Sequence, residues 1–128
     1  MILVDSSVVI DYIRTRDAKM LVLFQTRNAA ICGITRAEVL HGARNPADRS
    51  RLLALLGTFG QLAVADVLWD KVGDHLAELR AHGITVPFQD VVIATVAIEN
   101  DIELWTHDAQ FQMIQNVLPA LKLFVEPP

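Results

Sequence analysis

Short apolar runs alternate with longer helical patterns along this chain, and this alternation restricts the choice of fold. The runs read MILVD at residues 1–5, AAIC at residues 29–32 and IELWT at residues 102–106. Between them, apolar residues recur at helical spacing. Strands that are separated by helices pair in parallel through right-handed crossovers. The sequence therefore predicts a three-layer α/β/α domain with a mainly parallel sheet of four or five strands.

The remaining elements are predicted from weaker patterns. Helices are expected at residues 6–14, 18–26, 36–43, 46–59, 67–82, 87–99 and 108–114. Further short extended segments are expected at residues 62–64, 84–86 and 121–125. Ser6 and Ser7 are suited to start the first helix, and Thr35 is expected to open the third.

Length and composition agree with a single globular domain over residues 1–128. The chain has 128 residues, of which 52% are hydrophobic and 20% are charged. A domain of this size buries about two-thirds of the surface that its unfolded chain exposes. Intrinsic disorder, a disulfide scaffold and a collagen-like repeat are excluded by this composition.

The apolar segments indicate an intracellular protein. The apolar start of the chain meets Asp5 too early for a signal peptide, and no apolar run approaches the ~20 residues of a membrane span. Cys32 is the single cysteine and lies in an apolar run, which is typical of a buried core thiol. We therefore expect a cytoplasmic location and no membrane partner.

The charge of the chain gives no general affinity for nucleic acid. Fifteen Asp and Glu oppose eleven Lys and Arg, for a net charge of −4. Most of the basic residues, however, lie within the first 51 positions. A polyanionic partner and a solvated helix face explain this distribution equally well.

Four acidic residues occupy junctions between predicted strands and helices. Asp5 ends the first strand, and Glu38 lies in the first turn of the helix after residues 29–32. Asp90 follows the extended segment at 84–86, and Asp108 starts the helix after residues 102–106. A parallel sheet gathers such junctions along one edge, where ligands bind in open α/β folds.

Helix capping is the alternative explanation for each of these acids. Thr35 and Glu38 have the spacing of a capping box, in which the glutamate bonds back to the first backbone N–H. Asp90 and Asp108 at helix starts gain ~0.3–1 kcal/mol each from the helix dipole. Asp5 can cap its own turn.

The surroundings of Asp90 favour a bound cation instead. The helix after it, residues 91–98, is apolar nearly all round, so the carboxylate is expected to point toward the core. An unpaired charge there is very costly, and no Lys or Arg lies near Asp5, Asp90 or Asp108 in sequence. Gly42, four residues after Glu38, further indicates a close approach by a backbone or a ligand. Oxygen ligands select Mg²⁺ or Mn²⁺ over zinc.

Four segments in this order carry a family pattern. They are residues 4–12 (VDSSVVIDY), 35–42 (TRAEVLHG), 90–97 (DVVIATVA) and 104–111 (LWTHDAQF). Together they resemble PIN domains and, more narrowly, the VapC toxins of bacterial and archaeal toxin–antitoxin pairs. The resemblance covers essentially the whole chain. Gln110 is a small departure, because the family often has Asp or His at that position.

The resemblance implies a metal-dependent endoribonuclease that hydrolyses RNA phosphodiester bonds and is the toxin of a type II toxin–antitoxin system. It implies Mg²⁺ as cofactor, with Mn²⁺ as a substitute, a VapB-type antitoxin as inhibitor and a homodimer. The catalytic residues and metal ligands implied are Asp5, Glu38, Asp90 and Asp108. Asp5 and Asp90 are the first choices for direct ligation because their settings are the most buried.

Other residues are expected to support this chemistry. Ser7 and Thr106 place hydroxyls at the same strand ends, where they can orient ligands or a phosphate. The arginines expected to contact substrate are Arg14, Arg36 and Arg44. The apolar helices at residues 18–26 and 47–59 are candidates for an antitoxin groove, although ordinary packing on the sheet explains them equally well.

Two other functions remain open from the sequence. One is a PIN-like module that binds RNA or a partner without catalysis. The other is a receiver-type phosphoacceptor domain, which has a similar length and acids at strand ends. A receiver needs adjacent acids after the first strand, whereas Asp5 is followed by Ser6 and Ser7.

Overall fold

Four parallel strands form a sheet at the centre of the computed structural model, which describes residues 1–128. The strands are β1 (Ile2–Val4), β2 (Ala29–Cys32), β3 (Gly60–Leu62) and β4 (Glu103–Trp105). Their order across the sheet is β3-β2-β1-β4, so β1 is central. Leu3 pairs in register with Ala30 on one side and Leu104 on the other. The predicted parallel sheet is confirmed, with four strands.

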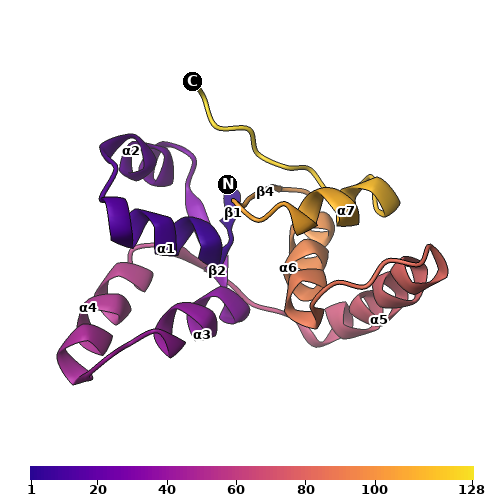
Figure 1. Cartoon of the computed structure of the whole chain (residues 1–128), viewed down its shortest axis with the longest axis horizontal. Helices are drawn as coiled ribbons and strands as arrows, with labels where there is room; N and C mark the ends of the chain where they lie inside the picture. Colours follow the sequence, from indigo (N-terminus) through magenta and orange to yellow (C-terminus); the bar gives the residue numbers. More distant parts are fainter.

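Seven helices cover the two faces of this sheet. They are α1 (Ser6–Thr15), α2 (Ala18–Thr26), α3 (Gly33–His41), α4 (Pro46–Leu56), α5 (Asp66–Ala81), α6 (Phe88–Glu99) and α7 (Gln110–Val117). Figure 1 shows α1 to α4 on one side of the strands and α5 to α7 on the other. The predicted three-layer α/β/α architecture is therefore confirmed.

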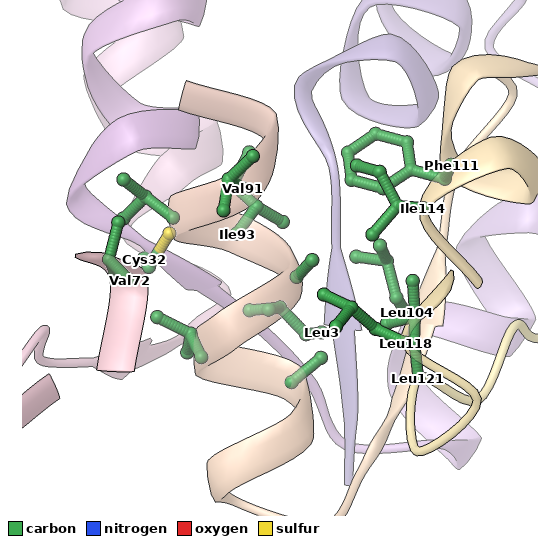
Figure 2. Close-up of a cluster of buried hydrophobic side chains, with 14 of the residues drawn as sticks. Leu3, Cys32, Val72, Val91, Ile93, Leu104, Phe111, Ile114, Leu118 and Leu121 are labelled. Carbon is green, nitrogen blue, oxygen red and sulfur yellow. The ribbon is translucent and has the colours of Figure 1, made fainter. Parts of the chain in front are cut away.

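Alternation along β1 divides the core into two parts. Ile2 and Val4 point into a cluster that includes residues of α1, α2 and α4. Leu3 points the other way, into a cluster built mainly by α5, α6 and α7, and Figure 2 shows it beside Leu104 and Leu118. Because successive side chains of a strand face opposite sides, a short apolar run buries residues in both layers.

Local sequence signals account for the starts of several helices. Asp17 precedes α2, and its carboxylate accepts hydrogen bonds from the backbone N–H groups of Lys19 and Met20. Asn45 caps α4 in the same way, with Pro46 at its first position. Pro87 precedes α6, as its fixed backbone angle allows.

Two of the predicted strands are absent from the sheet. Residues 84–86 form no strand, and Ile84 and Val86 instead pack against the core cluster beside α5 and α6. Residues 121–125 make only one bridge, between Leu123 and Leu104, so they add no strand to the sheet. Both segments are apolar, but their burial comes from side-chain packing and not from a strand ladder.

Two other predictions need correction near helix ends. The last helix begins at Gln110 and not at Asp108, because Asp108 accepts a hydrogen bond from the Gln110 N–H and so precedes the helix. Gly42 lies just after α3 and not inside a helix, and a side chain at that position would meet only the carbonyl of Val39 in ordinary contact. Gly42 therefore gives no evidence for a close approach.

Burial agrees with the prediction for the single cysteine. The Cys32 thiol is buried, and desolvation raises its pKa. No helix of the chain combines the length and the apolar character that a membrane crossing requires.

Candidate functional site

Asp5 occupies the centre of the edge where the strands end. It follows β1, it is only 4% exposed, and its backbone N–H donates to the carbonyl of Trp105 at 2.9 Å. Its Oδ2 accepts hydrogen bonds from the Ser7 hydroxyl at 2.7 Å and from the Thr106 hydroxyl at 2.9 Å. These contacts fix the carboxylate between β1 and β4.

The two hydroxyls join the β1–α1 junction to the β4–α7 junction. The His107 backbone N–H donates to Ser7 Oγ at 3.0 Å, and the Asp108 N–H donates to Thr106 Oγ1 at 3.0 Å. The hydroxyl oxygens of Ser7 and Thr106 lie 3.3 Å apart. Both residues that the sequence suggested as supporting hydroxyls therefore contact Asp5 directly.

Glu38 reaches this edge from α3. The helix begins at Gly33, so Thr35 lies inside it, and the Thr35 hydroxyl donates to the carbonyl of Val4 at 3.2 Å. The predicted capping box is therefore wrong. Glu38 instead accepts a hydrogen bond from Ser6 at 3.2 Å. Burial raises the pKa of Glu38, and this effect outweighs the hydrogen bond from Ser6, which lowers the pKa. The negative charge of Asp5 adds to the rise.

Asp90 is the most perturbed carboxyl group of the chain. It lies in the first turn of α6, is 7% exposed, and precedes seven consecutive buried residues. Burial, followed by the charges of Asp5, Asp108 and Glu38, raises its pKa to about 7. The other three acids thus lie within electrostatic range of Asp90. None of the four forms an ion pair with Lys, Arg or His.

Asp108 lies at the entry to α7 and within electrostatic range of Asp90. Its Oδ1 accepts a hydrogen bond from the Gln110 N–H at 2.9 Å, at the entry to α7. Its charge also contributes to the raised pKa of Asp90. Unlike Asp5 and Asp90, it is exposed to solvent. A capping bond and a place in the acidic cluster are therefore compatible.

The carboxylate donors fit a hard divalent cation that keeps part of its water shell. No three His, Cys, Asp or Glu side chains converge to form a ready-made metal cage. Mg²⁺ does not require one, because it keeps several waters and binds through one or two carboxylates. The cluster offers carboxylate oxygens and negative charge without a compensating cation, which is the chemistry that Mg²⁺ and Mn²⁺ prefer.

Comparison with known families agrees with this geometry. The model of the PIN domain family matches residues 2–116. The chain belongs to the PIN domain family. This match excludes the receiver-type alternative. A comparison with curated proteins gave no significant match.

Solved structures of toxin–antitoxin proteins share the fold of this PIN domain. VapBC2 from Rickettsia felis, bound to a DNA fragment from its promoter, matches with a TM-score of 0.85 and 22% identity over 99% of this chain and 100% of that chain. DNA-bound VapBC from Salmonella typhimurium gives 0.82 and 22% over 96% of each chain. VapC20 from Mycobacterium tuberculosis, described as a sarcin-ricin loop cleaving toxin, gives 0.70 and 15% over 88% and 94%. The predicted resemblance to VapC-type PIN domains is therefore confirmed for the fold.

The three predicted substrate arginines occupy different places in this PIN domain. Arg14 and Arg44 line a pocket that also contains Glu38, and each pairs with a nearby aspartate, at 2.8 Å and 3.6 Å respectively. Arg36 donates to Gln61 of β3 at 3.1 Å. Arg14 and Arg44 therefore share a pocket with Glu38, and Arg36 is not part of its lining.

Sequence reasoning missed a group of residues beside the PIN-domain site. His107 lies between two carboxylates, with Nδ1 at 2.5 Å from Asp11 Oδ2 and Nε2 against Glu126 Oε1. Partial burial lowers the pKa of His107, but hydrogen bonds and charges of Glu126 and Asp11 outweigh it, so the pKa is raised overall. Glu126 belongs to no motif, so the sequence contained no signal for this contact.

The raised pKa of Asp90 predicts that metal affinity depends on pH. A cation must displace the proton that Asp90 holds below about pH 7. We expect the affinity for Mn²⁺, measured by calorimetry between pH 5 and 8, to fall about tenfold for each pH unit below 7. A flat profile over this range would contradict the placement of Asp90 in the metal site.

Proposed function

We propose that this PIN domain, spanning residues 1–128, is a metal-dependent endoribonuclease and the toxin of a type II toxin–antitoxin pair. The observation that carries the proposal is Asp90, a buried carboxyl group whose pKa is raised by burial and by three neighbouring acids. An arrangement of this kind costs stability unless a cation binds. Among PIN domains of this fold, VapC20 is described as cleaving the sarcin-ricin loop, which supports RNA as the substrate.

Asp5 and Asp90 would hold Mg²⁺ or Mn²⁺ directly, and Glu38 and Asp108 would complete the shell directly or through water. When bound, such a cation neutralises charge on the scissile phosphate and activates water for attack. The Ser7 and Thr106 hydroxyls both donate to Oδ2 of Asp5, so they orient this carboxylate. Hydrogen-bonded groups of this kind keep a ligand in position and tune it.

Basic side chains near the cluster would attract the RNA backbone. Arg14 and Arg44 line the pocket beside Glu38 and are mostly exposed, so their charges can reach a phosphate. Arg36 completes the proposed set from the side of β3. Because the acids repel a polyanion until a cation enters, binding and cleavage of RNA should share a metal requirement.

The antitoxin would be a VapB-type protein that binds the apolar surface of α2 and α4. Leu21 and Val22 of α2 are exposed, and a pocket between these helices is lined by Leu21, Phe24 and Leu55. The related folds from Rickettsia felis and Salmonella typhimurium were solved as VapBC complexes, which supports a partner of this class. A homodimer and a cytoplasmic location are further parts of the proposal.

Incubation of the purified protein with labelled structured RNAs, tRNA included, tests this function. We expect defined products in Mg²⁺ or Mn²⁺ and none in EDTA, because the carboxylates cannot position a phosphate without a cation. Asp90→Asn purified in parallel controls for a contaminating nuclease. Products that persist in EDTA or in the variant would contradict the proposal, and a complete lack of products would favour a non-catalytic binding module.

A further inference from the structure

The last residues of the chain run back along the sheet toward the acidic cluster. After α7, the Lys122 carbonyl accepts from the Leu104 N–H and the Phe124 N–H donates to the Leu104 carbonyl, each at 2.8 Å. Figure 1 shows this segment continuing away from α7 as an extended tail. It lies beyond residues 2–116, the part that matches the PIN family.

Aromatic packing fixes the tail on β4. The Phe124 ring lies 5.2 Å from the Trp105 ring. The Arg27 guanidinium lies over the same Phe124 ring, at 5.5 Å from its centre. Trp105 is itself buried and contacts Phe24 at 5.3 Å. Aromatic and cation–π contacts of this type stabilise packing, so the tail has a defined path up to Phe124.

This path delivers the Glu126 carboxylate to the two residues that flank Thr106. Glu126 Oε1 accepts from the indole N–H of Trp105 at 2.7 Å, and the same oxygen contacts Nε2 of His107. The opposite ring nitrogen of His107 is held by Asp11 of α1 at 2.5 Å. Trp105 and His107 are thus both bonded to the tail, and His107 is also bonded to α1.

The segment held in this way carries groups of the proposed site. The Thr106 hydroxyl donates to Asp5, and the backbone N–H of His107 donates to Ser7, which also donates to Asp5. Asp108 follows directly and contributes to the raised pKa of Asp90. A shift of residues 105–108 would therefore move the carboxylate of Asp108. It would also loosen the contacts of the Ser7 and Thr106 hydroxyls that orient the Asp5 carboxylate.

We propose that Glu126 is a positioning residue for the reaction, because it holds the segment that presents Thr106 and Asp108 to the carboxylate cluster. This inference rests on the proposed nuclease function. Glu126 touches neither Asp5 nor Asp108, so it acts through Trp105 and His107. The tail is accordingly part of the working site and not only a cover for β4.

Replacement of Glu126 separates positioning from simple stabilisation. We expect Glu126→Ala to lower kcat for RNA cleavage about 10- to 100-fold with KM for RNA unchanged, as for groups that orient metal ligands. Glu126→Gln keeps an oxygen that accepts both hydrogen bonds, so it should retain most of the activity. A matched control is Asp101→Asn, which removes another anchor of the tail, the 2.7 Å ion pair with Lys122, and touches no hydrogen bond of residues 105–108. Asn tolerates the positive φ of 52° at this position.

Mn²⁺ binding gives a second readout that needs no RNA. Glu126→Ala should weaken Mn²⁺ affinity about 10- to 100-fold, whereas Asp101→Asn should leave it unchanged. All variants are compared below the melting temperature of the least stable one. If the wild type binds Mn²⁺ but cleaves no RNA, the nuclease proposal fails while the affinity comparison still tests positioning. Wild-type kcat and Mn²⁺ affinity in Glu126→Ala, or an equal loss in Glu126→Gln, would overturn the inference.

Discussion

Replacing Asp90 with asparagine is expected to reduce RNA cleavage by about 10²–10³-fold, the usual effect of removing one group that stabilises developing charge. The asparagine side chain has nearly the same shape but carries no charge, so it cannot attract a cation as the carboxylate does. Asp90 is buried at the start of α6 and faces three other acids. Its loss therefore removes one of the two buried carboxylates of the cluster. The measurement is kcat/KM for a defined RNA in Mg²⁺.

Asp70→Asn is the matched control for this experiment. Asp70 lies on the exposed side of α5, and removing its charge changes the net charge of the protein by the same amount. We expect the control to cleave like the wild type and both variants to show the wild-type circular dichroism. An Asp90→Asn protein that cleaves as fast as the control would remove Asp90 from the active site.

Stability of the metal-free protein is expected to decrease as pH rises from about 4 to about 7. The pKa of Asp90 is about 7 in the folded chain and 3.8 when unperturbed, so the folded state binds the extra proton between these values. Stability falls with pH wherever the folded state binds more protons. Allowing for solvent screening at this edge, the loss is about 2–3 kcal/mol. The raised pKa of Glu38 acts in the same direction.

Urea unfolding in EDTA at pH 4 to 8 measures this loss. Asp90→Asn should remove most of the decrease, since asparagine does not titrate, and should be more stable than the wild type at pH 8. Added Mg²⁺ should raise the stability of the wild type much more than that of the variant, because a ligand stabilises the state that binds it. Wild-type and Asp90→Asn curves that run parallel over this range would show that Asp90 is not strained in the folded chain.

The sheet and the gathering of acids were predictable because they depend on chain order. Apolar runs separated by helical patterns indicate parallel strands, and parallel strands place every strand-to-helix junction at one edge. Asp5, Glu38, Asp90 and Asp108 come together for this reason. The family pattern added the expected activity, which the positions of the acids alone do not specify.

Features that depend on side-chain competition were not predictable. Thr35 and Glu38 have capping-box spacing, but they do not cap the helix. In the folded chain the Thr35 hydroxyl donates to the Val4 carbonyl, and Glu38 accepts from the Ser6 hydroxyl. Residues 121–125 have strand composition, yet only Leu123 forms a bridge to β4. The contact of Glu126 with His107 joins residues 19 positions apart without a local pattern. Each of these outcomes is decided by tertiary structure.

The acids of the proposed site come from both layers of the divided core. Glu38 comes from the layer of α1 to α4, Asp90 comes from the layer of α5 to α7, and Asp5 lies at the end of the strand between them. A nascent or partly unfolded chain that has assembled only one layer holds an incomplete set of acids. If the proposed function holds, we expect cleavage only after both layers have assembled, and no cleavage by fragments that hold one layer.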